Sequence, residues 1–500
     1  MFQKDSPMSL VGSDVLGLIT AGMYDNPLTI YREYIQNTAD AIASAGDGGE
    51  GRVEIQIDPS QLCVKIRDNG PGLAHEAAVR ALLPIAQSQK HRESDRGFRG
   101  IGRLAALAFS DSVTFLTRTR NDRLVTRIAW DGSELRRKIN AARQTESVIR
   151  ECVTVEQLTG LEHPTHFFEV QITGIGRHAA GLMLNRNAVR NYVAEVCPVP
   201  FASTFPFASK IEKLLDKGRR PLVLNVILDG EVSPVTRRFA DLIRFAEDRM
   251  DSFTELEEVE VPSLDRRGSA AVGWIAHSSY LGAIPKGYGI RGLRGRIGNI
   301  QIGDETIFDT LFPEERFNRW CVGEIHILDP RIVPNGRRDF FEPGPHVRNL
   351  ENHVRTIAHR ISARCRTASS QRHKERRFQT SLHQIEEAFD LATSGYLSNK
   401  DAQVLVNRAM NHIQEIRKNI GATNGHVGER LEQLEALERK WGSFQPPREP
   451  TSLRGIKESE VATYRKVFQT LAEISPSPGA AKEMIEAVLA RPQAQTRKMF

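Results

Sequence analysis

The sequence predicts an α+β protein, with an N-terminal α/β sandwich, a second mixed α/β domain and a helical C-terminal region. Two observations predict this class. Up to about residue 328, helical polar stripes alternate with short segments of strand-like pattern, whereas the residues beyond about 351 have helical patterns. At 500 residues the chain has room for about three domains, whose predicted limits are 1–185, 186–350 and 351–500.

The composition is that of an ordinary globular protein, with 40% hydrophobic and 26% charged residues. The net charge of +6 is small for this length and does not by itself require a nucleic-acid partner. Five cysteines lie far apart without metal-ligand spacing, which indicates free thiols in a reducing compartment. The N-terminus lacks a signal-peptide core, and no segment has the length of a membrane span. We therefore expect a cytoplasmic protein without a membrane partner.

The first motif is an amphipathic helix that carries three polar residues on one narrow stripe. In YREYIQNTADAI, Glu33, Asn37 and Asp40 stand at positions i, i+4 and i+7. Taken alone, this spacing is typical of a solvated helix face. The two motifs that follow make a ligand site the better interpretation.

The second motif follows two predicted strands, at residues 52–57 and 62–66. The second of these strands leads into DNGPGL, which contains Asp68, Gly70 and Gly72. A carboxylate at a strand end, followed by glycines that let a ligand approach the backbone, can accept a hydrogen bond from an exocyclic amine. The alternative is an ordinary Asp-Asn-Gly turn.

The third motif, GFRGIGR, carries Gly97, Gly100 and Gly102 directly before a predicted helix at residues 104–109. Amide groups at the start of a helix attract an anion, so a phosphate chain is the natural ligand. A lone glycine-rich loop is weak support for a site. Three such motifs in this order predict a nucleotide pocket.

Together the motifs resemble the ATP-binding domain of the GHKL superfamily, which includes gyrase, the ninety-kilodalton heat-shock chaperones, histidine kinases and MutL-type repair proteins. The resemblance covers residues from about 12 to 173. The segments ITAGMYDNPLTIYREYIQNTADAI and IAQSQK (85–90) are most similar to the chaperones, and MORC-type ATPases share much of the pattern. The resemblance implies a GHKL (Bergerat) fold, ATP and Mg²⁺ as ligands, and ATPase activity.

The resemblance also implies a role for each matching residue. Glu33 is expected to be the general base that activates water, Asn37 to coordinate Mg²⁺, and Asp68 to bind the adenine amine. Thr165, in PTHFFEV, is expected to meet adenine through a water, although Pro164 replaces the usual glycine of the family. The residues expected to contact ATP are Asn37, Asp40, Asp68, Gly70, Gly72, Ser88, Lys90, Gly97, Arg99, Gly100, Ile101, Gly102 and Thr165.

The chemistry of ATP hydrolysis agrees with these roles. The reaction needs a carboxylate to orient and deprotonate water, a metal to neutralise the phosphates, and donors where charge develops. Glu33 and Asn37 lie one helical turn apart, so the base and the metal ligand can face one phosphate chain. Water and phosphate oxygens would complete the magnesium shell. The sequence contains no Walker lysine motif.

Beyond the nucleotide domain, strands are predicted at residues 222–228, 271–276 and 322–328, with a helix at 238–249. This alternation indicates the second mixed α/β domain. The basic segment PKGYGIRGLRGRIGN (285–299) suits phosphate contact, partner binding or a mobile loop, and we expect the loop.

The segment IVPNGRRDFFEP carries the most informative residues of the second domain. Asn335, Arg338 and Asp339 match the spacing of an asparagine, an arginine and an acid in the chaperones. By that resemblance Arg338 is a second catalytic residue, which reaches the γ-phosphate when the two domains dock. Arg337 takes its place if the register differs by one residue. The alternative is a basic surface turn.

The C-terminal region combines a basic run with a leucine seam. The basic residues between 355 and 377 form either a solvated helix face or a phosphate-binding stripe. Leu431, Leu434 and Leu437 indicate a short seam for helix pairing. SFQPPREPTS, residues 443–452, is a proline-rich linker.

Three functional classes share the predicted pocket. The first is a chaperone-like ATPase, in which lid closure and nucleotide-dependent homodimer formation remodel a protein client. The second is a MORC-like or repair-like ATPase that clamps DNA with the basic run. The third is a nucleotide sensor without hydrolysis, against which Glu33 argues. We favour the chaperone-like class. A DNA clamp would differ from it by binding DNA with an affinity that falls steeply as salt rises.

Overall fold

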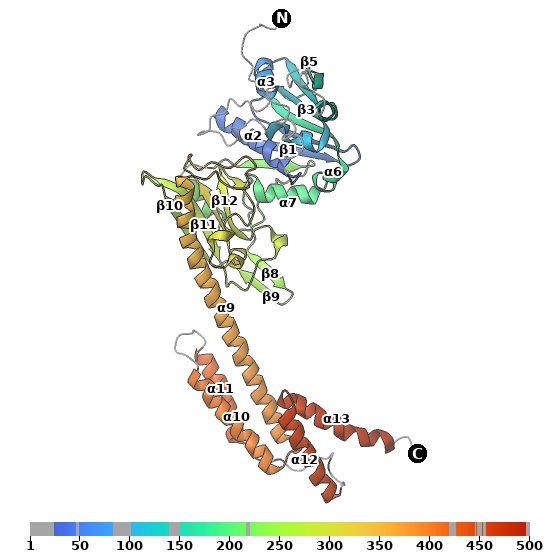
Figure 1. Cartoon of the computed structure of the whole chain (residues 1–500), viewed down its shortest axis with the longest axis vertical. Helices are drawn as coiled ribbons and strands as arrows, with labels where there is room; N and C mark the ends of the chain where they lie inside the picture. The colour runs from blue at the N-terminus through green and yellow to red at the C-terminus, as the bar shows by residue number, and fades with distance from the viewer. Residues whose placement is uncertain are drawn as a thin grey trace. The chain divides into compact units, whose positions relative to one another are not determined.

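The computed structural model describes residues 25–46, 50–83, 102–139, 151–160, 162–216, 221–419, 427–445, 447, 453 and 457–496. The fold is α+β, as predicted from the sequence. The chain divides into two compact units, Met1–Ala368 and Ser369–Phe500 (Figure 1). Among the described helices, none combines the length and the apolar character that a membrane span requires. The predicted domain limits at 185 and 350 stay predictions.

A seven-stranded sheet underlies the N-terminal domain (Figure 1). Its strands lie in the order β5 (Val153–Thr159), β4 (Leu124–Asp131), β3 (Ser110–Arg118), β6 (Phe167–Ile175), β2 (Cys63–Asp68), β1 (Gly51–Asp58) and β7 (Leu224–Leu228). β1 and β7 are parallel, and all other neighbours are antiparallel. The predicted strand at 222–228 therefore belongs to the first sheet, whereas we expected it in the second α/β domain.

The helices of this domain gather on one large core with the sheet. They are α2 (Thr29–Ala45), α3 (His75–Leu82), the 3-10 helix η1 (Gly102–Ala108), α4 (Gly132–Ile139), α6 (Arg177–Met183) and α7 (Arg186–Val196). Further along the chain, α8 (Ala208–Asp216) packs in a separate, aromatic-rich cluster.

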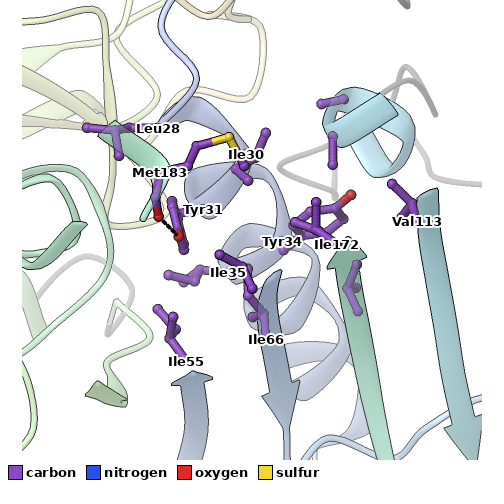
Figure 2. Packing of buried hydrophobic residues seen from close by; sticks show 14 of the residues in the cluster. Leu28, Ile30, Tyr31, Tyr34, Ile35, Ile55, Ile66, Val113, Ile172 and Met183 are labelled. Carbon is purple, nitrogen blue, oxygen red and sulfur yellow. Dashed lines mark hydrogen bonds between the residues drawn. The ribbon is translucent and has the colours of Figure 1, made fainter. Parts of the chain in front are cut away.

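Helix α2 is fixed on the sheet by its apolar side (Figure 2). Tyr31 and Ile35 are fully buried and share a core with Ile55 of β1 and Ile66 of β2. The Tyr31 hydroxyl donates a 2.7 Å hydrogen bond to the carbonyl of Met183, which joins α2 to α6. Burial raises the pKa of Tyr31 well above its usual range, so this hydroxyl stays a donor. The polar stripe of α2 is thereby held in one orientation.

A five-stranded sheet forms the second domain. Its order is β10 (Glu255–Pro262), β11 (Ser269–His277), β14 (Val322–Ile327), β12 (Gly292–Ile297) and β13 (Ile300–Ile302). β12 and β14 are parallel, and the other neighbours are antiparallel. The strands predicted at 271–276 and 322–328 are confirmed. Three 3-10 helices accompany the sheet: η2 (Lys286–Tyr288), η3 (Asp309–Leu311) and η4 (Glu315–Trp320).

The helix predicted at 238–249 is wrong, because a β-hairpin occupies this segment. Its strands are β8 (Leu242–Ala246) and β9 (Arg249–Ser252). Ile243 is buried, whereas its neighbours Leu242 and Arg244 are exposed, so the burial has the period of a strand. Phe239 and Ile243, four residues apart and both buried, also fit a helical period, and this ambiguity explains the failed prediction.

The basic segment 285–299 is not the loop that the sequence predicted. Its six residues 292–297 form β12, which pairs with the central strand β14 of the second sheet. Arg294 and Arg296 are each only 2% exposed. They pair with Glu195 and Glu324, which compensate charges that burial would otherwise make very costly.

Helix α9 (Pro345–Thr393) contributes to both compact units. Its first part packs on the second sheet through Leu350, Val354 and Ile361. Three arginines of the predicted basic run make ion pairs in this unit: Arg360 with Glu257, Arg364 with Glu255 at 2.8 Å, and Arg366 with Glu314 at 2.8 Å. Their side chains are 54%, 44% and 53% exposed, so this part of the run is a solvated face whose charges are paired with carboxylates.

The second unit consists of helices. After the last part of α9 come α10 (Asn399–Asn419), α11 (Val427–Gly442), α12 (Glu458–Ile474) and α13 (Pro478–Thr496). Leu434 and Leu437, two members of the predicted seam, are buried in the core of this unit with Trp441 and Phe468. The seam thus pairs helices within the chain. The predicted linker at 443–452 lies largely outside the described residues.

Candidate functional site

Glu33 occupies a buried position on α2, between two arginines. The residue is 7% exposed. Its Oε1 atom lies 3.1 Å from Nη2 of the adjacent Arg32 and 3.9 Å from Nε of Arg338. The carboxylate is therefore held by two cations, one of which comes from the second domain.

Gly102 lies against the other carboxylate oxygen of Glu33. A Cβ atom at this position would lie 2.1 Å from Oε2, so a larger residue would displace the carboxylate. The Tyr34 hydroxyl donates a 2.9 Å hydrogen bond to the Arg103 carbonyl and holds this segment on α2. The helix predicted at 104–109 is the 3-10 helix η1, whose residues 104–107 are buried.

The remaining members of the predicted phosphate loop lie outside the described residues. They are Ser88, Lys90, Gly97, Arg99, Gly100 and Ile101. Their expected contacts with phosphate stay predictions, as does the chaperone-like segment at 85–90.

Asn37 and Asp40 continue the stripe that begins at Glu33. Asn37 is half-buried, and Asp40 is 6% exposed. In the described part of the chain, no group of three His, Cys, Asp or Glu side chains is placed to bind a metal. Asn37 offers an amide oxygen on a stripe that also carries the carboxylates of Glu33 and Asp40. A site with few protein ligands suits Mg²⁺, because this ion keeps several of its waters and takes further ligands from phosphate.

Asp68 ends strand β2 and accepts hydrogen bonds at both oxygens. The Thr38 hydroxyl donates to Oδ2 and the Gly70 amide to Oδ1, each at 2.8 Å. Burial nevertheless raises the pKa of Asp68 to about 6, because these hydrogen bonds offset only part of the cost of removing the carboxylate from water. The carboxylate is thus a fixed acceptor, oriented from two sides.

The two glycines after Asp68 are required by close contacts. A Cβ atom on Gly70 would lie 2.9 Å from Oδ1 of Asp68. Gly72 has a φ of +69°, and a Cβ atom there would lie 2.0 Å from the carbonyl oxygen of Arg118. Gly72 is therefore placed by its packing against the end of β3, and the structure gives it this role whatever ligand binds.

Thr165 lies just before β6 and is exposed. Its neighbour His166 makes a 2.9 Å hydrogen bond through Nδ1 with the carbonyl of Gly70, so the two predicted adenine-binding segments are joined. Arg118 fixes the same segment by donating to the carbonyls of Gly160, at 3.1 Å, and His163, at 2.8 Å.

Sequence reasoning missed Thr38 and His166. Each stands directly beside a residue that was singled out, Asn37 or Thr165. A polar residue adjacent to a ligand motif was the available signal. The hydrogen bonds of Thr38 to Asp68 and of His166 to the Gly70 carbonyl show that both side chains hold the loop after β2.

Arg338 approaches Glu33 from a tight turn. Its φ of 57° is unusual for a residue other than glycine. The turn is closed by hydrogen bonds from the Arg338 amide to the Asn335 carbonyl, at 3.1 Å, and from the Asn335 side chain to Asp339, at 2.5 Å. Arg337 instead has 56% of its side chain exposed. Of the two candidate arginines, Arg338 lies beside Glu33.

The comparisons with known proteins concern this same region. Residues 28–165 match the family of histidine kinase-, DNA gyrase B-, and HSP90-like ATPases. The chain carries a GHKL ATPase domain. Glu33 and Asp68 lie within the matched residues, whereas His166 directly follows them and Arg338 belongs to the second domain.

Known proteins similar to this domain include a chaperone and DNA mismatch repair proteins. The chaperone protein HtpG of Rhodococcus jostii is 28% identical over 144 residues, which are 24% of this chain and 22% of the relative. The DNA mismatch repair protein MutL of Shewanella oneidensis is 30% identical over 132 residues, 25% of this chain and 20% of the relative. MutL of Aeromonas salmonicida is 30% identical over 137 residues, 26% of this chain and 21% of the relative. The chain thus matches about a fifth of the length of these relatives.

Proposed function

We propose that this protein binds and hydrolyses ATP at the residues of α2, the loop after β2 and the Arg338 turn. The observation that carries the proposal is the 3.9 Å approach of Arg338 Nε to Glu33 Oε1. It brings a cation of the second domain to the carboxylate of the GHKL domain that is best placed to act on water. A surface turn without function would not require a buried arginine at this point.

In the proposed reaction, Glu33 orients a water molecule and accepts its proton. Arg32 and Arg338 both lie beside this carboxylate. The γ-phosphate would compete for the Arg338 guanidinium, which is well suited to planar recognition of phosphate oxygens. Contact with phosphate would thereby free Glu33 from one of its two cations.

Asp68 and Asn37 would hold the two ends of the nucleotide. Asp68 would accept a hydrogen bond from the exocyclic amine of adenine. Hydrogen bonds from Thr38 and Gly70 keep its carboxylate in one orientation. Asn37 would bind Mg²⁺, which neutralises phosphate charge when it is bound. His166 and Arg118 keep the segment containing Thr165 close to the adenine end.

For the output of ATP turnover we propose the chaperone-like class, in which the nucleotide state remodels a protein client and favours a homodimer. The charge distribution supports this choice over a DNA clamp. Arg360, Arg364 and Arg366, which lie in the basic run that would bind DNA, make ion pairs with carboxylates of the second domain. An arginine in such a pair releases fewer counterions from a DNA phosphate than an unpaired one.

The test is ATP turnover of the full chain with and without duplex DNA across a salt series, together with sedimentation with and without nucleotide. We expect turnover that does not respond to DNA, and association that increases with ATP. Stimulation by DNA that disappears steeply as salt rises would instead support the repair-like clamp. Absence of turnover in every condition would contradict the ATPase proposal itself.

A further inference from the structure

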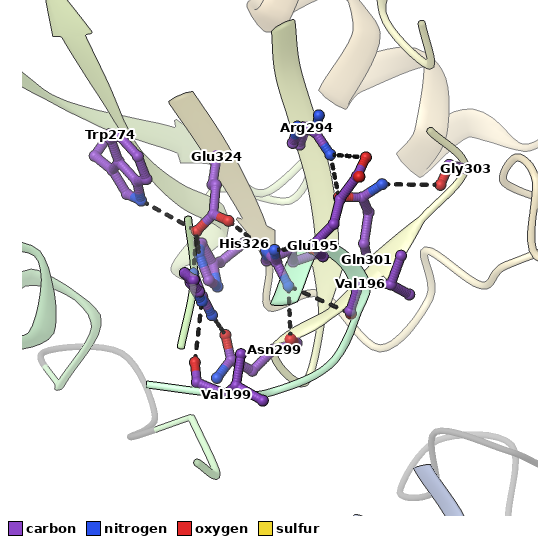
Figure 3. A network of polar contacts seen from close by, with 12 residues as sticks. Glu195, Val196, Val199, Trp274, Arg294, Asn299, Gln301, Gly303, Glu324 and His326 are labelled. Carbon is purple, nitrogen blue, oxygen red and sulfur yellow. Dashed lines mark hydrogen bonds and ion pairs between the residues drawn. The ribbon is translucent and has the colours of Figure 1, made fainter. Parts of the chain in front are cut away.

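A polar network joins helix α7 to the second sheet (Figure 3). Glu195, in the last turn of α7, receives a 2.6 Å hydrogen bond at Oε1 from Arg294 of β12. The same nitrogen of Arg294 donates a 2.8 Å hydrogen bond to Oε1 of Gln301 on β13. Arg294 is 2% exposed and Gln301 is 1% exposed, so water cannot readily replace either contact.

The network continues from Gln301 to the turn that carries Arg338. The Gln301 side chain donates a 3.1 Å hydrogen bond to the carbonyl of Gly303. The amide of Gly303 donates in turn to the carbonyl of Arg338 at 2.8 Å. Gly303 has a φ of +64°, and a Cβ atom there would lie 2.6 Å from the Asp339 carbonyl oxygen. The strand end at Gly303 therefore fits closely against the Arg338 turn.

We infer that Gln301 is a positioning residue, which holds the Arg338 turn at the distance from Glu33 that the reaction requires. This inference rests on the proposed function of Arg338. The side-chain oxygen of Gln301 accepts a hydrogen bond from Arg294, which also pairs with Glu195 of α7. The side-chain nitrogen of Gln301 donates to the Gly303 carbonyl, beside the Arg338 turn. A shift of α7 relative to the second sheet is thereby transmitted to the arginine, because Arg294 and Gln301 are buried and every link in the chain is a hydrogen bond.

The test is a double-mutant cycle in the full chain with Gln301→Met and Arg338→Ala. Methionine conserves most of the volume but removes both hydrogen bonds. We expect Gln301→Met to reduce kcat by roughly tenfold to a hundredfold, as for a catalytic group displaced by about 1 Å, with KM for ATP changed less than about threefold. Turnover is normalised to sites that bind a fluorescent ATP analogue, so unfolded protein does not enter the comparison.

The cycle distinguishes positioning from general stability. If Gln301 acts through Arg338, Gln301→Met has less than about a twofold effect on kcat when Arg338 is already alanine. An equal loss in both backgrounds would overturn the inference, as would wild-type kcat in the single variant. If Arg338→Ala itself leaves turnover unchanged, the proposed role of Arg338 fails, and the inference fails with it.

Two further measurements make the test specific. Gln301→Glu keeps an acceptor for Arg294 but cannot donate to the Gly303 carbonyl at neutral pH, so we expect it to lose kcat as well. In nucleotide-free protein, Gln301→Met should increase hydrogen exchange at the Gly303 amide, which bonds to Arg338. Glu305→Gln is the matched control, because Glu305 pairs with Arg291 at 3.0 Å only two residues beyond Gly303. Normal exchange at Gly303 in the Gln301 variants would contradict the inference.

Discussion

The Thr38 hydroxyl donates a 2.8 Å hydrogen bond to Oδ2 of Asp68, which joins the stripe-bearing helix α2 to the end of strand β2. Asp68 is thereby oriented from the helix as well as from its own loop. Burial nevertheless raises the pKa of this carboxyl group to about 6. The protonation state of Asp68 therefore changes within a range of pH that binding experiments can reach.

Adenine nucleotide affinity should decrease as the pH falls through about 6, because the protonated carboxyl group loses an acceptor for the adenine amine. The effect on stability has the opposite direction. Since the folded state raises this pKa, the contribution of Asp68 to the free energy of unfolding is fully present at acid pH and is lost as the pH rises through about 6. Calorimetry between pH 5 and 8 measures the affinity. Nucleotide phosphates titrate nearby, so the control is Asp68→Asn, which should show a shallower dependence.

Asp68→Asn should weaken nucleotide binding at neutral pH by roughly tenfold to a hundredfold, the range for a hydrogen bond to a charged group. The amide presents one acceptor where the carboxylate has two, and it can turn a donor toward adenine. The melting temperature without nucleotide should not fall, because a neutral amide avoids the cost of a buried carboxylate. Wild-type affinity in this variant would mean that Asp68 is only a turn residue.

Glu33→Ala should preserve ATP binding and reduce hydrolysis by roughly a hundredfold or more, as expected for loss of a general base. Alanine also leaves Arg32 and Arg338 without their shared carboxylate. Glu33→Gln is the better-matched variant, because it keeps the shape and an acceptor for both arginines while removing the base. Turnover is measured beside binding of the same nucleotide. Unchanged hydrolysis in Glu33→Gln would remove Glu33 from the mechanism.

The sequence was sufficient to predict the local structure that carries the candidate site. Helix α2 and the strand pair β1 and β2 follow from apolar periodicity. Gly70 and Gly72 were predicted for the approach of a ligand, whereas in the structure both are in close contact with protein atoms. The burial of Arg294 and Arg296 could not be predicted, because a basic, glycine-rich segment has no local signal for acids that lie far along the chain. The helix prediction at 238–249 failed for a related reason. The spacing of Phe239 and Ile243 fits both a helix and a strand, and only packing in the tertiary structure decides between them.

Glu324→Gln should lower the free energy of unfolding by about 3–5 kcal/mol, as for a buried ion pair that loses one partner. Burial by itself raises the pKa of Glu324, but Arg237 and Arg296 hold it well below its usual range. Both arginines are 2% exposed and would keep uncompensated charge. The control is Glu314→Gln, in a more exposed pair with Arg366, which should cost less than about 1 kcal/mol. Equal denaturant midpoints for the two variants would contradict the prediction.

Arg338→Ala should slow turnover by at least about a hundredfold while leaving ATP affinity within a fewfold, because an arginine that meets the γ-phosphate acts mainly in the transition state. The whole chain is required for this test, since a fragment ending at residue 185 would lack β7 and α7.

Arg337→Ala is the matched control: its side chain is 56% exposed, against 10% for Arg338. We expect this variant to hydrolyse ATP at the wild-type rate, and Arg338→Lys to recover only part of the loss, because lysine cannot make the same forked contact. A strong loss in Arg337→Ala with normal turnover in Arg338→Ala would transfer the role to the neighbouring residue, and normal turnover in both would leave the second domain without a part in the chemistry.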